Sequence, residues 1–149
     1  MDSLKERIRE DMKASMKGGD KARLGVIRMI LAAIKQVEVD ERVELGDDRV
    51  IVVLDKMLKQ RRESIKQYRD ANRIDLAEIE EAEVQVIQDF LPQALTEAEI
   101  DQMVAKAIAE TGAESVKDMG KVMAILKPQM QGRADMALVS ARIKAGFPV

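Results

Sequence analysis

The sequence of 149 residues is long enough for one medium-sized domain or two very small ones. It contains no cysteine and no histidine, which excludes disulfides, thiolate chemistry and the commonest general base and transition-metal ligand. We therefore expect no metal, no cofactor and no autonomous catalysis. No apolar run approaches the roughly eighteen residues that a membrane-spanning helix needs. The absence of an apolar leader favours a cytoplasmic location.

The net charge of −2 conceals a very uneven charge distribution. Residues 56–73 hold seven cations and two acids, and residues 121–149 hold five cations and one acid. Between them, residues 74–120 hold twelve acids and two cations. Two basic segments that flank an acidic one are compatible with a polyanionic partner. With only three aromatic residues in the chain, extensive base stacking on a single strand is not expected.

Apolar residues recur at helical spacing almost throughout the chain, whereas alternating strand patterns are lacking. In the first half, Ser3 and Glu6 form a capping-box pair that begins a helix, and Gly18 and Gly19 end it. A second helix is expected from about residue 20, followed by a polar loop over residues 40–48. A third helix is expected from residue 47 or 48 through Tyr68. A fourth is expected from about residue 75 to Leu91, where Pro92 blocks continuation.

The second half of the chain predicts three shorter helices. Thr96 and Glu99 form another capping box, and Gly112 ends the helix that it begins. A sixth helix is expected to end around Lys127 and Pro128, and a seventh follows Gly132 and ends before Gly146. We place a domain boundary at residues 91–95. The prediction is an all-α protein with a four-helix bundle-like domain over residues 1–91 and a three-helix tail domain over residues 96–149.

The C-terminal segment is the most specific part of the sequence. Residues 118–128 read DMGKVMAILKP, residues 132–136 read GRADM, and Val139 and Ser140 follow. This text resembles the tail domain of the GatB subunit of the tRNA-dependent amidotransferase and its stand-alone relatives, the YqeY proteins. Five upstream segments are also similar to the helical half of a YqeY protein: residues 60–65, 68–69, 75–77, 80–83 and 90–92. The resemblance covers essentially the whole chain, in order.

This resemblance implies a helical bundle joined to a three-helix tail. In the amidotransferase, the corresponding tail helps to hold the transfer RNA, while ammonia production and aminoacyl activation lie elsewhere. Nothing in the 149 residues matches the amidase Ser/Lys residues or the metal-bearing activation site. The resemblance therefore favours contact with tRNA over amidotransferase chemistry.

Five basic residues of the tail are candidates for contacts with tRNA phosphates. Lys121 lies off the apolar face of its helix, Lys127 lies near the end of that helix, and Arg133 follows a glycine in a turn. Arg142 and Lys144 on the last helix are weaker candidates. The alternative is structural: lysines near a helix C-terminus complement the helix dipole, and Arg133 pairs with Asp135.

Two glycines of the tail could allow a backbone approach to a ligand. Gly120 interrupts an apolar helical pattern, where glycine costs about 1 kcal/mol relative to alanine. We expect a close helix crossing at Gly120, with an approach to a ligand as the alternative. Gly132 is expected to reverse the chain direction.

In the first half, Arg61 occupies a position in the apolar stripe of its helix, so its stem should cover apolar surface. Its guanidinium is expected to reach an acid in the cluster Glu80, Glu81 and Glu83, and contact with nucleic acid is the less favoured alternative. The same acids could suggest a metal site, but without histidine or an Asp-x-Asp loop we interpret them as a salt-bridged face.

Three functions follow, in order of preference. The first is binding of tRNA, or of a protein complex that handles aminoacyl-tRNA, through the C-terminal tail. The second is a protein–protein interaction module that uses the helical half. The third is an accessory component of glutamine-dependent amide transfer to aminoacyl-tRNA.

Overall fold

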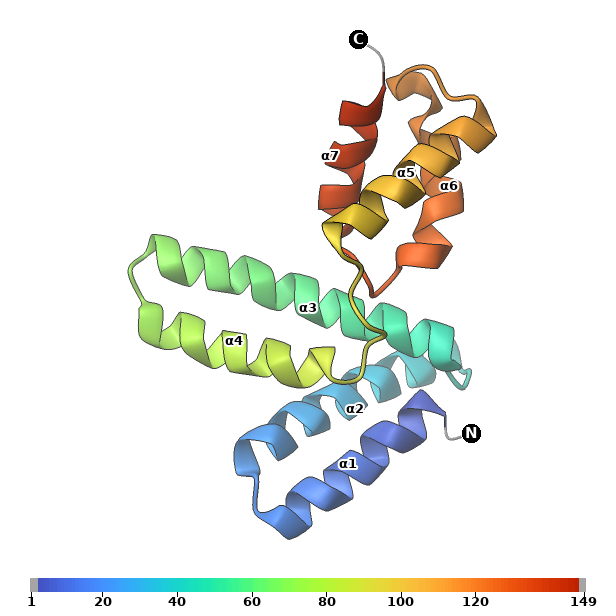
Figure 1. Ribbon diagram of the computed structural model, residues 1–149. Helices are drawn as coiled ribbons and strands as arrows, with labels where there is room; N and C mark the ends of the chain where they lie inside the picture. The colour runs from blue at the N-terminus through green and yellow to red at the C-terminus, as the bar shows by residue number, and fades with distance from the viewer. Residues whose placement is uncertain (1–2, 148–149) are drawn as a thin grey trace. The chain divides into compact units, whose positions relative to one another are not determined.

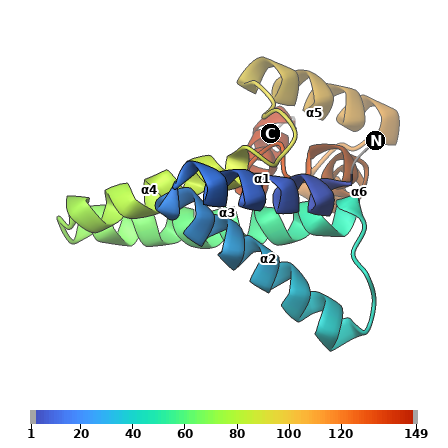
Figure 2. The same ribbon diagram turned by 90° about the horizontal axis from the view of Figure 1, so that it is seen from below.

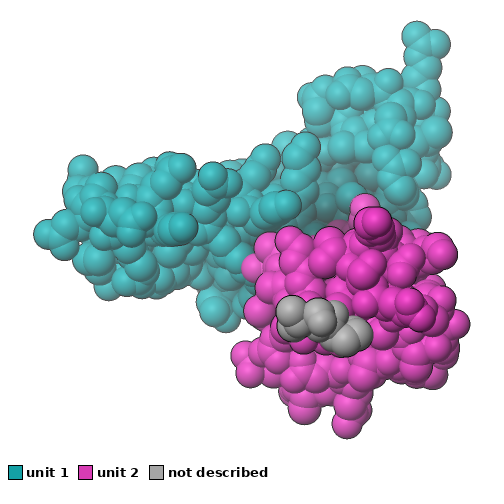
Figure 3. Space-filling view, turned by 90° about the horizontal axis from the view of Figure 1, so that it is seen from above, with its two compact units in different colours: residues 1–91 teal, residues 92–149 magenta. Residues whose placement is uncertain are grey.

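The computed structural model describes residues 3–147, and within this range every regular element is helical. The described residues form seven α-helices and one short 3-10 helix, and they contain no strand (Figure 1). The all-α fold class predicted from the helical spacing is therefore confirmed. The chain divides into two compact units, the first ending at Leu91 and the second beginning at Pro92 (Figure 3).

Four helices build the first unit: α1 (Leu4–Gly18), α2 (Lys21–Glu41), α3 (Asp47–Asp70) and α4 (Ile74–Gln88). The capping box of Ser3 and Glu6 begins α1, and Gly19 ends it with a φ of 70°. The predicted polar loop is shorter than expected, because α2 continues to Glu41. Leu45 anchors this loop: its side chain is buried, and its N–H donates to Glu38 at 2.9 Å.

In the first unit, α1 packs against α2, and α3 packs along α4 in a long antiparallel hairpin. Figures 1 and 2 both show the turn of this hairpin lying beyond the ends of α1 and α2. The core is formed by the apolar faces of all four helices; its fully buried members include Ile8, Ile27, Ile30, Val50, Leu54 and Ile87. None of residues 59–76, at the turn end of the α3–α4 hairpin, is buried, so this part of the first unit is an arm of two helices.

Arg23 on α2 ties three elements of the first unit together. Its guanidinium donates to both carboxylate oxygens of Asp11 on α1, at 2.9 and 2.7 Å, and to Asp89 after α4 at 2.7 Å. It also lies 5.7 Å from the centroid of the buried Phe90 ring. Hydrogen bonding from Arg23 lowers the pKa of Asp11 below its ordinary value. This network joins the start of the bundle to its last helix.

The second unit contains α5 (Glu97–Thr111), the 3-10 helix η1 (Val116–Asp118), α6 (Met119–Met130) and α7 (Met136–Gly146). Thr96 and Glu99 form the predicted capping box of α5, and Gly112 ends this helix with a φ of 66°. The three α-helices enclose a core of their own, formed by Ile100, Val104, Val122, Leu126, Met130, Val139, Ile143 and Phe147.

The predicted end of α6 at Lys127 and Pro128 is wrong, because the helix continues to Met130. Proline removes its own N–H from the helical ladder, and its ring crowds the carbonyl four residues earlier. The helical bonding nevertheless continues beyond Pro128, where Gln131 N–H donates to the carbonyl of Lys127 at 3.0 Å. Met130 is fully buried in the core of the second unit. Burial of this side chain stabilises the extra turn beyond the proline.

The predicted domains, residues 1–91 and 96–149, stay a prediction about independent folding, and residues 1–2 and 148–149 of them lie outside the described range. Over residues 3–147, none of the helices has the length and apolarity that a membrane crossing requires.

Candidate nucleic-acid interface

The outer face of α6 is formed by five exposed residues: Gly120, Lys121, Ala124, Lys127 and Pro128. At 100° per residue, these five fall within one sector of about 120° on the helix. The opposite side of α6 carries the buried Val122, Leu126 and Met130. We call these five residues the α6 face; it is a smooth strip of small residues with a lysine on each side.

The lysines of the α6 face have almost no ion-pair partners. Lys121 lies 3.9 Å from Asp118, and its side chain is 71% exposed, so this pair is weak. Lys127 is exposed and forms no ion pair within residues 3–147. Lys144 on α7 is likewise exposed, with no ion pair in the same range. Of the five predicted contacts, these three are the ones with ammonium groups available to a ligand.

Arg133 is half-buried and has a structural role in the turn between α6 and α7. Its Nε donates to the carbonyl of Gln93 at 3.1 Å, and its own carbonyl accepts from Leu95 N–H at 2.8 Å. These two bonds hold the segment before α5 against the turn. Asp135, the partner suggested by the sequence, instead caps α7 by accepting from Ala137 N–H at 3.0 Å. A role of Arg133 in RNA binding stays a prediction, with its Nε already engaged.

Arg142 joins α7 to α5 through an ion-pair cluster. Its Nη1 lies 2.6 and 2.8 Å from the two carboxylate oxygens of Asp101, and its Nη2 lies 3.5 Å from Glu97. Hydrogen bonding to Asp101 raises the pKa of Arg142 above its ordinary value. The guanidinium is therefore neutralised within its own unit, which makes Arg142 the least available of the candidates.

The two tail glycines have different surroundings. The helix crossing expected at Gly120 does not occur, because a Cβ added there would meet no heavy atom within 4 Å. Gly120 instead lies exposed near the start of α6, where it leaves the helix backbone open to solvent. Gly132 has a φ of 76° in the turn before α7, a conformation that glycine adopts without strain.

Lys117 was missed by the sequence reasoning. It is exposed in η1, four residues before Lys121, and it forms no ion pair within residues 3–147. The signal that could have found it is its position: in a continuous helix, residues i and i+4 lie on one face. Lys117 precedes the apolar pattern of α6, so that pattern does not indicate it.

Arg61 is paired within the first unit, as the apolar stripe of its helix predicts. Its Nε donates to Glu83 on α4 at 3.0 Å, and its side chain is only 14% exposed. Its Nη1 also donates to the carbonyl of Met57 at 3.3 Å. Burial, with a further contribution from Glu83, raises the pKa of the neighbouring Glu80 above its ordinary value. These contacts confirm the structural interpretation of Arg61.

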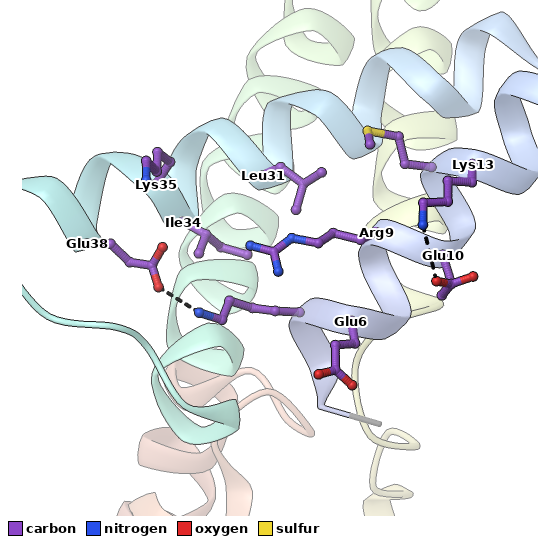
Figure 4. A pocket seen from close by; sticks show the side chains of 10 residues that line it. Glu6, Arg9, Glu10, Lys13, Leu31, Ile34, Lys35 and Glu38 are labelled. Atoms are coloured by element: carbon purple, nitrogen blue, oxygen red, sulfur yellow. Dashed lines mark hydrogen bonds and ion pairs between the residues drawn. The ribbon is translucent and has the colours of Figure 1, made fainter. Parts of the chain in front are cut away.

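A groove of about 380 Å³ lies between α1 and α2 (Figure 4). Leu31 and Ile34 form part of its floor, and Arg9 extends across it. On one side, Lys5 pairs with Glu38 at 2.8 Å. The hydrogen bond from Lys5 lowers the pKa of Glu38 below its ordinary value, and the hydrogen bond from Leu45 N–H contributes less. The charged carboxylate is therefore favoured as the partner of Lys5. Within residues 3–147, no group of three or more acidic, histidine or cysteine side chains is placed to hold a metal.

Comparison with known proteins adds a family and several relatives. A family model described as Yqey-like protein matches residues 5–147. The protein named altered inheritance of mitochondria protein 41, mitochondrial, from Pyrenophora tritici-repentis is 32% identical, over 93% of this chain and 77% of the relative. The protein of the same name from Lachancea thermotolerans is 30% identical, over 94% of this chain and 79% of the relative.

The expected cytoplasmic location is corrected by these relatives, which are named as mitochondrial proteins. The expectation rested on the absence of an apolar leader, a feature of secretory signals. Mitochondrial transit segments are amphipathic and rich in arginine, so a search for an apolar leader does not address them.

Proposed function

This chain belongs to the Yqey-like protein family, and from that membership we propose that it binds tRNA through the α6 face of its C-terminal unit. The observation that carries the proposal is the combination of an exposed Gly120 with lysines on both sides of a smooth helical strip. The resemblance of the same segment to the amidotransferase tail implies the kind of ligand.

The chemistry of the α6 face suits a phosphate backbone. Lys121 and Lys127 present mobile ammonium groups, which contact phosphates as point charges. Gly120, Ala124 and Pro128 between them present no long side chain, so a sugar–phosphate backbone can approach the helix closely. Contacts of this kind are largely independent of sequence and strongly sensitive to salt. Lys117 and Lys144 are additional contacts in this proposal.

The test measures binding of labelled tRNA to the full chain by fluorescence anisotropy over a series of salt concentrations. The double variant Lys121→Ala/Lys127→Ala should bind all tRNAs more weakly, with a salt slope flatter by about two units. A control variant, Lys17→Ala/Lys21→Ala, loses the same charge from exposed sites in the first unit. The control should bind almost as tightly as the wild type.

Two outcomes would reject the proposal. Equal losses in the two double variants would mean that net charge, rather than the α6 face, decides the affinity. Absence of tRNA binding by the wild type, together with a partner protein that co-purifies after RNase treatment, would favour the interaction-module function instead. Turnover of glutamine in amide transfer would require residues that the α6 face does not provide.

A further inference from the structure

The seven cations of residues 56–73 fall into two groups, which the structure separates by their partners. Arg61 pairs with Glu83 and Arg69 pairs with Glu81, both on α4, and Arg73 pairs with Asp75. A second group is exposed and forms no ion pair within the described residues; it consists of Lys56, Lys59, Arg62 and Lys66. The acids of α4 therefore neutralise the arginines turned toward them and leave the other group uncompensated.

The uncompensated group lies along one side of the helix. Its members are spaced three, three and four residues apart, which keeps them within a sector of about 120° on the side of the helix opposite the buried Val50 and Met57. We call this surface the α3 outer face. Within residues 56–66 the only acid is Glu63, which is exposed in the same sector and lowers the net charge of the face from +4 to +3. The row from Lys56 to Lys66 is about 15 Å long at 1.5 Å per residue.

The form of this row favours a duplex-like polyanion over the alternatives. One strand of a duplex carries about one phosphate per 3.4 Å of axis, so a row of about 15 Å spans roughly four phosphates. A membrane-surface helix needs an apolar face free to enter the lipid, whereas the apolar face of α3 is buried in the core. Stacking of single-stranded bases needs exposed aromatic rings, and the one aromatic residue of α3, Tyr68, is half-buried.

We propose that the α3 outer face is a second phosphate-contacting surface, which binds the backbone of structured RNA. This inference rests on the proposed function in that both surfaces take the same class of ligand, and it adds a site in the first unit that the tail does not include. The contacts come from side chains on a rigid helix, since α3 packs along α4 for most of its length. Recognition by such a row follows duplex geometry and charge rather than base sequence.

The experiment compares three variants of the full chain with two fluorescein-labelled probes, unfractionated tRNA and a short RNA duplex. The first variant is Lys59→Ala/Arg62→Ala/Lys66→Ala, which changes the α3 outer face. The second is the tail variant Lys121→Ala/Lys127→Ala. The third, Lys17→Ala/Lys21→Ala/Arg28→Ala, removes the same charge as the first from exposed positions of α1 and α2. Thermal unfolding, followed by circular dichroism, establishes that each variant is folded.

For the α3 variant, affinity for both probes should fall about tenfold or more at about 100 mM salt, and the salt slope should flatten by about three units. The charge-matched control should change the slope by less than one unit. Binding by the α3 variant that equals the wild type, while the tail variant loses affinity, overturns this inference and leaves the proposed function standing. Loss of RNA affinity in the α3 variant, with full binding by the tail variant, supports this inference and rejects the proposed function of the α6 face.

Three further results would also overturn the inference. Equal losses in the α3 variant and its charge-matched control would assign the effect to net charge. Binding to vesicles containing phosphatidylserine that the α3 variant loses, with RNA affinity unchanged, would assign the face to anionic lipid. A wild-type chain that binds neither probe would reject both proposed surfaces.

Discussion

Arg61 and Arg62 are adjacent arginines with different expected roles: Arg61 stabilises the fold, and Arg62 contacts RNA. The substitution Arg61→Ala tests the first of these roles. Arg61 is 14% exposed and paired with Glu83, whose side chain is 22% exposed. Alanine removes this ion pair, the hydrogen bond to the carbonyl of Met57 and the apolar contacts of the arginine stem. The carboxylate of Glu83 then has no cation in contact. It also lies close to Glu80, whose pKa is raised by burial and by Glu83 itself.

The expected loss in the free energy of unfolding follows from the partial burial of the Arg61–Glu83 pair. Exposed ion pairs contribute about 0.2–1 kcal/mol, and removing one partner of a fully buried pair costs about 3–5 kcal/mol. The exposure of Arg61 and Glu83 lies between these limits but closer to burial, so we expect the free energy of unfolding to fall by about 2 kcal/mol. In a unit of this size, that loss corresponds to about 10 °C in the melting temperature. Arg62→Ala should change stability by less than about 0.5 kcal/mol.

The assay combines urea unfolding with tRNA binding for the same two variants. Arg61→Ala should lower the urea midpoint and, below its melting temperature, bind tRNA almost as the wild type does. Arg62→Ala should unfold like the wild type and bind tRNA more weakly. A double-mutant cycle with Glu83→Gln should return a coupling energy of about 1 kcal/mol or more. An Arg61→Ala variant that is as stable as the wild type but loses RNA binding would refute this reasoning.

Three other predictions follow from local features. Burial raises the pKa of Glu80 in the folded state, so the protonated carboxyl is compatible with the fold and the charged one destabilises it. Its stabilising contribution is therefore present below its unfolded pKa and is lost at higher pH. Glu80→Gln should raise the melting temperature at pH 7 and have no effect below about pH 4. Gly120→Ala should increase stability by about 0.5 kcal/mol, since its Cβ meets open space, and should weaken tRNA binding; unchanged binding would argue against a close approach there. Limited proteolysis should first cut at residues 92–96 or in the loop at 42–46, and first cuts within α3 would contradict the assignment of a rigid hairpin.

Much of the fold could be predicted because its signals are local. The capping boxes at Ser3 and Thr96 depend on residues three positions apart, and the glycines that end α1 and α5 depend on their own backbone conformation. Pro128 is also a local signal, and it led to the wrong predicted end of α6. Its local effect disfavours a helix, but burial of Met130 in the tertiary core outweighs that effect.

The candidate site was predicted less completely, because availability of a charge depends on neighbours distant in sequence. Arg142 is engaged by Asp101, about forty residues away, and Arg133 by the carbonyl of Gln93 at a similar separation. No pattern in the sequence identifies these partners. Arg61 was predictable because its apolar-stripe position requires a partner across the hairpin, where an acidic cluster follows. The exposed Gly120 could be found only from its surroundings.

The salt dependence of tRNA binding tests the central claim most directly. The affinity of the wild-type chain and of Lys121→Ala/Lys127→Ala should be measured between about 50 and 200 mM salt. Phosphate contacts at the α6 face predict a steep fall of wild-type affinity with salt and a slope flatter by about two units in the variant. A wild-type affinity that does not change with salt, or identical slopes for the two proteins, would contradict the account.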